Sequence, residues 1–240
     1  MKQMLFFLVA VLAACSIGMV GLANADEPGE RTYTFVYILT GPATDVSPEE
    51  QKTAFAGHFS NMRRMAEAGD LLMAGPYGEP KSDAGLRGLW VFTTDDTEKA
   101  LEHAATDPPG KLGIFVFEAF ELRTDDALWE LTRLENEEKA RKAADPDASQ
   151  EWSGRAYIIA TGKVSQFKEP KRTDGVLLLA TLVGAEDSRV EEDHWMVLLD
   201  ATTAEEAEAV LKEAGCDSSD WSLDLWYGSK VPEQLPSLRK

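Results

Sequence analysis

The chain has 240 residues, of which 44% are hydrophobic, and it carries a formal net charge of −18 at pH 7. This length and composition suit one or two globular domains with a packed core. Because 42 acidic residues face only 24 basic ones, nucleic acids and anionic membrane surfaces would be repelled and are poor partners.

The first 25 residues predict a cleaved secretory signal peptide. Lys2 is the only charged residue before Asp26, and an apolar run extends from Leu5 to Val11. Residues 23–25 read Ala-Asn-Ala, the small-x-small pattern that precedes a signal-peptidase site. We therefore expect an exported protein, periplasmic or extracellular, whose mature chain begins at Asp26.

Two other interpretations of the N-terminus stay open. Residues 12–15 read Leu-Ala-Ala-Cys, which resembles a bacterial lipobox and would make Cys15 the anchored N-terminus of a lipoprotein. The apolar stretch of 19 residues from Met4 to Leu22 is also just long enough to span a membrane uncleaved. In the mature chain Cys216 is the only cysteine, so no intrachain disulfide forms and we expect this thiol to be buried.

Residues 32–122 predict the element order β-α-β-β-α-β. Strand 32–40 has large apolar residues at 33, 35, 37 and 39 on one face and at 36 and 38 on the other, so both faces should be covered. The order is that of a ferredoxin-like split βαβ unit, an antiparallel sheet with both helices on one face. The remaining elements are expected as a helix at 48–68, strands at 71–74 and 88–94, a helix from 95 or 96 to about 105, and a strand at 112–122.

The helix predicted at 48–68 carries the first candidate functional group. Ser47 and Glu50 form a capping box at its start. Apolar residues at helical spacing form one face, namely Phe55, Phe59, Met62, Met65 and Ala66. His58 lies on this same face, so its imidazole is directed at whatever the helix packs against.

After a connecting helix at 124–143 and a Pro-containing linker at 145–149, the second half repeats the first imperfectly. About 14 residues separate its first two strands, against about 30 in the first half, so this half should lack the helix that carries His58. We expect an α+β fold in which two ferredoxin-like units pack as a pseudo-dimeric α/β barrel, with their sheets enclosing a pocket beside His58. The second-half elements are expected as strands at 156–161, 175–183, 195–199 and 221–227 and a helix at 203–214. The segments are then 1–25, 26–123, 124–150 and 151–240.

The first half resembles the YCII-related domain family. The residues that carry the resemblance are HFSNMRRMAEAGDLLMAGP at 58–76 and GLWVFTTDDTEKALEHAATDPPGKLGIFVFEAFEL at 88–122. The resemblance implies a ferredoxin-like domain that pairs into a dimeric α/β barrel with a His/Asp centre, which by position is His58 and Asp107. The second half matches loosely: Asp217 corresponds to Asp107, and the histidine has no counterpart.

A His/Asp pair suits general acid–base chemistry, because a carboxylate at one ring nitrogen fixes the tautomer and leaves the other nitrogen available near neutral pH. Such a pair could move a proton on a small carbonyl-bearing or aromatic substrate. Around it we expect Gly75 to let the backbone approach a ligand, Pro76 and Tyr77 to line the pocket, and Arg63 to bind a substrate carboxylate.

Other residues offer weaker candidates. A lone histidine on an apolar helix face can instead be a core residue bonded to the backbone, and Asp70 is a second candidate partner for His58. His103 falls off the inner face of its helix and is expected at the surface. The run Glu191-Glu192-Asp193-His194 does not predict a metal site, because adjacent residues of a strand or loop cannot converge on one ion.

We therefore expect an exported YCII-like small-molecule enzyme that uses His58 and Asp107 without a metal or organic cofactor, on a substrate that the sequence does not reveal. The alternative is a non-catalytic small-ligand-binding or scaffold protein on the same fold, which the missing second histidine favours. A monomer with an internal pseudo-dimer and a homodimer both fit the sequence.

Overall fold

The computed structural model describes residues 29–145, 147, 154–217 and 221–239. The signal peptide expected at 1–25 and the alternative lipid-attachment residue Cys15 lie outside these ranges, as does most of the expected linker. Among the described residues, no helix is both long enough and apolar enough to cross a membrane.

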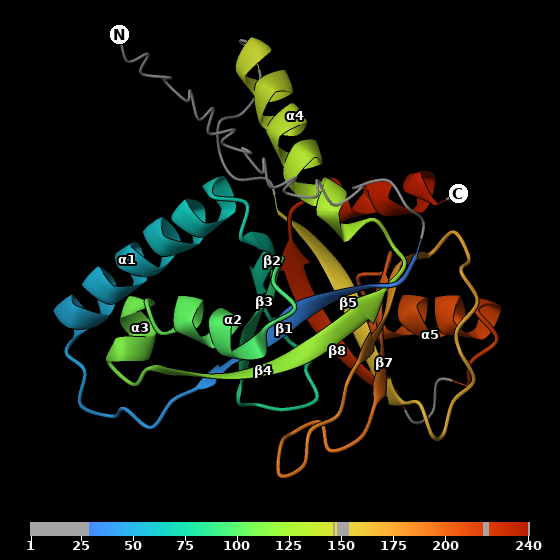
Figure 1. Cartoon of the computed structure of the whole chain (residues 1–240), viewed down its shortest axis with the longest axis horizontal. Coiled ribbons are helices and arrows are strands. Elements are labelled where there is room, and N and C mark those ends of the chain that lie inside the picture. Colours follow the sequence, from blue (N-terminus) through green and yellow to red (C-terminus); the bar gives the residue numbers. More distant parts are fainter. Residues whose placement is uncertain (1–28, 146, 148–153, 218–220, 240) are drawn as a thin grey trace, which may run out of the picture.

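The fold is α+β, with one antiparallel sheet that is rolled into a nearly closed barrel (Figure 1). The strands of the sheet are β1 (Arg31–Thr40), β2 (Leu71–Pro76), β3 (Leu86–Phe92), β4 (Phe115–Thr124), β5 (Arg155–Lys163), β6 (Val176–Leu182), β7 (His194–Leu199) and β8 (Ser222–Gly228). The α-helices are α1 (Pro48–Glu67), α2 (Thr97–Ala104), α3 (Pro108–Lys111), α4 (Leu131–Ala144) and α5 (Ala204–Glu213). Two 3-10 helices, η1 (Leu128–Glu130) and η2 (Val231–Leu238), complete the described elements.

The two halves of the sheet have the same strand order. The order across the sheet is β2-β3-β1-β4-β6-β7-β5-β8, so the first four positions and the last four follow one pattern. The halves join where β4 pairs with β6, at Leu122 opposite Leu182 and Arg123 opposite Thr181. Between β5 and β6 the chain forms no helix, although α1 occupies the matching interval of the first half. The shortened interval therefore removes one helix, as the sequence predicts.

The outer strands β2 and β8 approach each other and bring the barrel close to closure. The N–H of Gly78 donates to the carbonyl of Leu225 over 2.8 Å, and the N–H of Leu225 donates to the carbonyl of Pro80 over 3.0 Å. A Cβ at Gly75 would lie 1.9 Å from the carbonyl oxygen of Tyr227. Only glycine permits this approach of the two strands.

Three apolar clusters explain why both faces of the strands are apolar. The barrel interior is filled by large side chains from both halves, among them Phe35, Tyr37, Tyr157 and Trp226. A second cluster packs the outer face of the second half under α5, and a third packs the outer face of the first half under α1 and α2. The two faces of β1 divide between the interior and the third cluster, which confirms the expected alternation.

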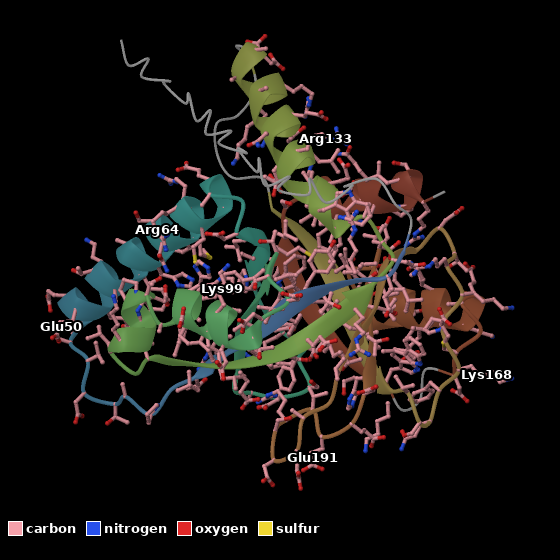
Figure 2. The ribbon with its side chains drawn as sticks, in the orientation of Figure 1. Glu50, Arg64, Lys99, Arg133, Lys168 and Glu191 are labelled. Carbon is pink, nitrogen blue, oxygen red and sulfur yellow. The ribbon has the colours of Figure 1, made fainter. Side chains whose placement is uncertain are left out.

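The helices lie outside the barrel. Figure 1 shows α1, α2 and α3 on one side, α5 on the opposite side, and α4 projecting away from the sheet. Only the beginning of α4 packs, through the buried Leu131 and Leu134. Figure 2 shows Arg133 on this projecting helix, and Glu50 and Arg64 along α1, with their side chains in solvent.

Some predicted boundaries differ from the structure. The strand expected from Leu112 begins only at Phe115, because Pro108 at the first helical position supports the short helix α3 and Gly113 then turns the chain with φ of +69°. The buried side of α2 is formed by Ala100 and Ala104, whereas Leu101 is 37% exposed. The C-terminal 3-10 helix η2 has no counterpart among the predicted elements.

Candidate functional site

His58 and Asp107 form a buried pair. The ring nitrogen Nδ1 of His58 lies 2.8 Å from Oδ1 of Asp107, and the two side chains are 10% and 0% exposed. The pair joins the middle of α1 to the residue that precedes α3, across 49 positions of sequence. Of the acidic residues considered for this role, the structure places Asp107, and not Asp70, at the histidine.

Local sequence explains how each partner is held. The capping box of α1 is present, with Ser47 and Glu50 bonded to each other's backbone, so the register of this helix is well defined. Asp107 is extended, with φ of −71° and ψ of 126°, because the residue before a proline avoids the helical region. The two consecutive prolines after it therefore limit the directions in which the carboxylate can point.

Gly57 permits the contact between the two helices that carry the pair. A Cβ at this position would lie 2.7 Å from Cγ of Pro108, well inside ordinary van der Waals contact. The missing side chain lets α1 lie directly against the start of α3. As a result, His58 on one helix reaches Asp107 at the start of the other.

Aromatic rings surround the imidazole. Trp90 stacks nearly parallel to it, with 5.6 Å between ring centroids and an interplanar angle of 21°. Phe55, Phe59 and Phe115 meet it edge-on, at centroid distances of 6.3, 5.6 and 5.7 Å. The imidazole is therefore packed among rings from α1, β3 and β4, with only Trp90 presenting its face to it.

The hydrogen bond assigns roles to the two ring nitrogens. An ionised carboxylate only accepts, so Nδ1 of His58 carries the proton and donates to Asp107, and Nε2 keeps its lone pair. No described residue forms a hydrogen bond with Nε2. The second carboxylate oxygen of Asp107, Oδ2, is buried and has no partner among the described residues. A buried polar atom without a hydrogen bond costs stability.

A pocket of about 460 Å³ lies beside His58, between α1 and the outer face of the first half-sheet. Its volume falls in the range usual for small-molecule sites. Most of its lining is apolar: Ile38, Phe55, Phe59, Met62, Trp90, Ile114 and Phe115. The expectation that the two sheets enclose this pocket is therefore wrong, since every lining residue comes from the first half. The barrel interior is instead filled by large aromatic and aliphatic side chains from both halves.

Of the other predicted site residues, some line the pocket and some do not. Gly75 and Pro76 line the pocket, although the close approach at Gly75 is to β8 and not to the pocket. Tyr77 does not line it, because this side chain is buried in the barrel interior, where its environment raises the pKa of the phenol chiefly through desolvation. Arg63 is exposed on α1 and is not among the lining residues. Phe59, expected in the buried face of the helix, is 60% exposed at the pocket edge.

Arg87 is the lining residue that sequence reasoning missed. It lies at an irregularity of the β1–β3 pairing, where Ile38 is opposite Gly88 but Leu39 is opposite Leu86, so that Arg87 has no partner in β1. An extra residue of this kind is a β-bulge, and it re-aims the side chain that it carries. The Nε of Arg87 donates to the hydroxyl of Thr40 over 2.7 Å, which holds the guanidinium at the pocket edge. Because the bulge depends on strand register, alternation in the sequence does not reveal it.

The remaining candidates lie apart from the pair. Asp70 lines a separate small hollow with His103, which is half-buried and stacks on Phe92 at 5.6 Å. Asp217, the loose counterpart of Asp107, is exposed. His194 bonds through Nδ1 to the carbonyl of Glu192, and within the described part of the chain no group of three or more His, Cys, Asp or Glu side chains is placed to hold a metal ion.

Two further hollows lie where the halves of the sheet meet. The larger, about 650 Å³, borders Asp126, whose carboxylate already accepts from Arg172, Arg239 and the N–H of Leu179 over 2.6 to 2.8 Å. The smaller, about 150 Å³, borders Asp224, whose Oδ1 accepts from the N–H of Ser82 over 2.5 Å. Both carboxylates are satisfied by the fold itself, so these hollows offer no group comparable to Nε2 of His58.

Comparison of the chain with protein-family models, with curated proteins and with solved structures found no match in any of the three.

Proposed function

We propose that this protein is an exported YCII-like small-molecule enzyme in which His58 and Asp107 transfer a proton to and from a bound substrate. The observation that carries the proposal is the arrangement at His58. A buried carboxylate holds one ring nitrogen, and the other nitrogen has no hydrogen-bond partner among the described residues and belongs to a side chain that lines an apolar pocket. Export rests on the signal-like pattern of residues 1–25.

The chemistry follows from the tautomer. A substrate with an acidic C–H next to a carbonyl would give that proton to Nε2 of His58, and the electron pair of the broken C–H bond would pass to the carbonyl oxygen as an enolate. The imidazolium so formed would be stabilised by the Asp107 carboxylate and by the stacked face of Trp90. Return of the proton to a carbon of the enolate completes an isomerisation or an exchange without any cofactor.

We further propose that the two halves are ferredoxin-like units packed as an internal pseudo-dimer. The repeated strand order and the position of α1 and α2 on one face of the first half support this assignment. Because residues 164–175 form no helix, the second unit has no element to carry a second histidine, and the chain would hold one site.

The runner-up function is small-molecule binding without chemistry. It is favoured by the aromatic packing around the imidazole and by the lack of a helix between β5 and β6 that could carry a second histidine. In that case the pair would position the ring as a hydrogen-bond acceptor for a ligand, and no proton of the ligand would exchange with solvent.

Proton exchange distinguishes the two functions. Ligands are first found by thermal shift with a library of small carbonyl and aromatic compounds, and each is then incubated with the protein in D₂O while its C–H signals are followed by NMR. We expect exchange that falls at least about a hundredfold in His58→Ala and Asp107→Asn, in line with the usual contribution of a general base. His103→Ala is the matched control and should exchange normally. Binding without exchange in the wild type would reject the enzyme and leave the binding protein.

A further inference from the structure

We infer that the pocket beside His58 takes a compound with a carboxylate group and an apolar, preferably aromatic body, and that Arg87 binds the carboxylate. The inference deepens the proposed function, on which it rests for the identity of the site. Its evidence is separate: the charges that line the pocket, the hydrogen bonding of Arg87 and the apolar walls.

The charge of the pocket is opposite to that of the protein. Of the described residues that line it, only His58 and Arg87 have an ionisable side chain, while the whole chain carries a net charge of −18. Asp107 is not a lining residue and stands behind the imidazole, where it is 0% exposed. The lining carries no carboxylate among the described residues, so an anionic ligand would meet the arginine there without a competing acidic side chain on the pocket wall.

The guanidinium of Arg87 has N–H donors that form no hydrogen bond with the described residues. Its Nε bonds to Thr40, but Nη1 and Nη2 make no hydrogen bond or ion pair with any described residue. Arg155 and Arg189, by contrast, each pair with two carboxylates. The two terminal nitrogens of a guanidinium match the two oxygens of a carboxylate, so the unengaged fork of Arg87 is a receptor for that group.

The walls of the pocket identify the rest of the ligand. The rings of Phe55, Trp90 and Phe115 and the side chains of Ile38 and Met62 form its apolar surface. Phe59, which is 60% exposed at the edge, is an aromatic surface for a ligand to cover. A flat apolar body would lie among these rings, with its carboxylate at Arg87 and its reacting carbon toward Nε2 of His58.

Matched acids and amides test the inference. Phenylacetate, phenylpyruvate and 3-phenylpropanoate are titrated against the wild-type protein by calorimetry, each beside its primary amide, which keeps the body and removes the charge. We expect the acids to bind more tightly than the amides, and Arg87→Gln to weaken the acids by about ten- to thirtyfold while leaving the amides unchanged. Arg87→Lys keeps the positive charge but loses the two-pronged guanidinium, so its affinity for the acids should lie between those of the wild type and Arg87→Gln. Arg63→Gln, an exposed arginine outside the pocket, is the control and should change nothing.

The outcomes separate this inference from the proposed function. Equal binding of acids and amides by the wild type, failure of every acid to bind, or unchanged acid binding in Arg87→Gln would each overturn the carboxylate assignment. An Arg87-dependent preference for acids that is accompanied by no proton exchange supports the assignment and rejects the enzyme. Arg87 is exposed, so its substitution should not prevent folding, and a circular dichroism spectrum of each variant checks this.

Discussion

The coupling between His58 and Asp107 can be measured as a free energy with a double-mutant cycle. The two residues are replaced by alanine singly and together, and the free energy of unfolding is determined for all four proteins. The single variants lose the hydrogen bond and also leave the remaining partner buried without it. The double variant loses the bond once and leaves nothing unpaired, so the two single effects should not add.

The structure sets the size of this coupling. The bond is 2.8 Å long and its partners are 10% and 0% exposed, so solvent screens the interaction little. Hydrogen bonds to charged groups contribute roughly 1.5–3 kcal/mol, and leaving a buried polar partner unsatisfied costs roughly another 1–3 kcal/mol. We therefore expect a coupling energy of at least about 2 kcal/mol at pH 7, and each single variant should lose at least about 4–8 °C in Tm, the shift that 2 kcal/mol gives for a chain of this size.

Urea unfolding followed by tryptophan fluorescence provides the four free energies. A second cycle, with His103→Ala in place of His58→Ala, is the control, because His103 has no hydrogen bond to Asp107 and should give a coupling near zero. A His58–Asp107 coupling below about 0.5 kcal/mol, the usual scatter for independent sites, would show that the pair does not form in solution, and the proposed chemistry would lose its basis.

Three further changes probe other parts of the structure. Gly57→Ala adds a methyl group that would lie 2.7 Å from Pro108, so α1 and α3 must separate and the rate of ligand proton exchange should fall at least about tenfold. Alanine also raises helix propensity by about 1 kcal/mol, which should keep the urea midpoint close to that of the wild type. The control is Ser60→Ala at an exposed position of α1, which should leave the exchange rate unchanged. Burial raises the pKa of Asp224, so the folded protein holds this proton to higher pH than the unfolded chain and loses stability as pH rises from about 4 through the folded-state pKa. The stability of Asp224→Asn relative to wild type should therefore increase from pH 4 to pH 7, and a constant or decreasing difference in urea titrations would contradict this assignment. Burial also raises the pKa of the Cys216 thiol, so a disulfide reagent should label it at pH 8 many times faster in urea than in buffer, whereas equal rates would show that the thiol is accessible in the folded protein.

Local patterns predicted most of the elements correctly. The alternation of β1, the capping box of α1 and the short interval between β5 and β6 each depend on neighbouring residues, and each appears in the structure as expected. The pairing of His58 with Asp107 was predicted from the inward face of a helix and from the family resemblance. The two residues are 49 positions apart, so helix periodicity alone could not specify the distance between them.

Other features depend on contacts between distant segments. Arg87 reaches the pocket because the register between β1 and β3 shifts by one residue near Leu39, and no local sequence pattern predicts that shift. Tyr77 turns into the barrel because β2 meets β8 there, and Gly75 is required by the same approach. The pocket lies outside the barrel because aromatic and aliphatic residues of both halves already fill the interior.

The sequence by itself determined the order of the strands and longer helices, the α+β class and the residues able to carry acid–base chemistry, since periodicity, capping and turn residues act over a few positions. Only the tertiary structure decided where the pocket lies, which arginine borders it and which glycine brings the catalytic candidates together. Those properties arise from strand register and from the closeness of two backbones, and both are set by packing between segments that the sequence holds far apart.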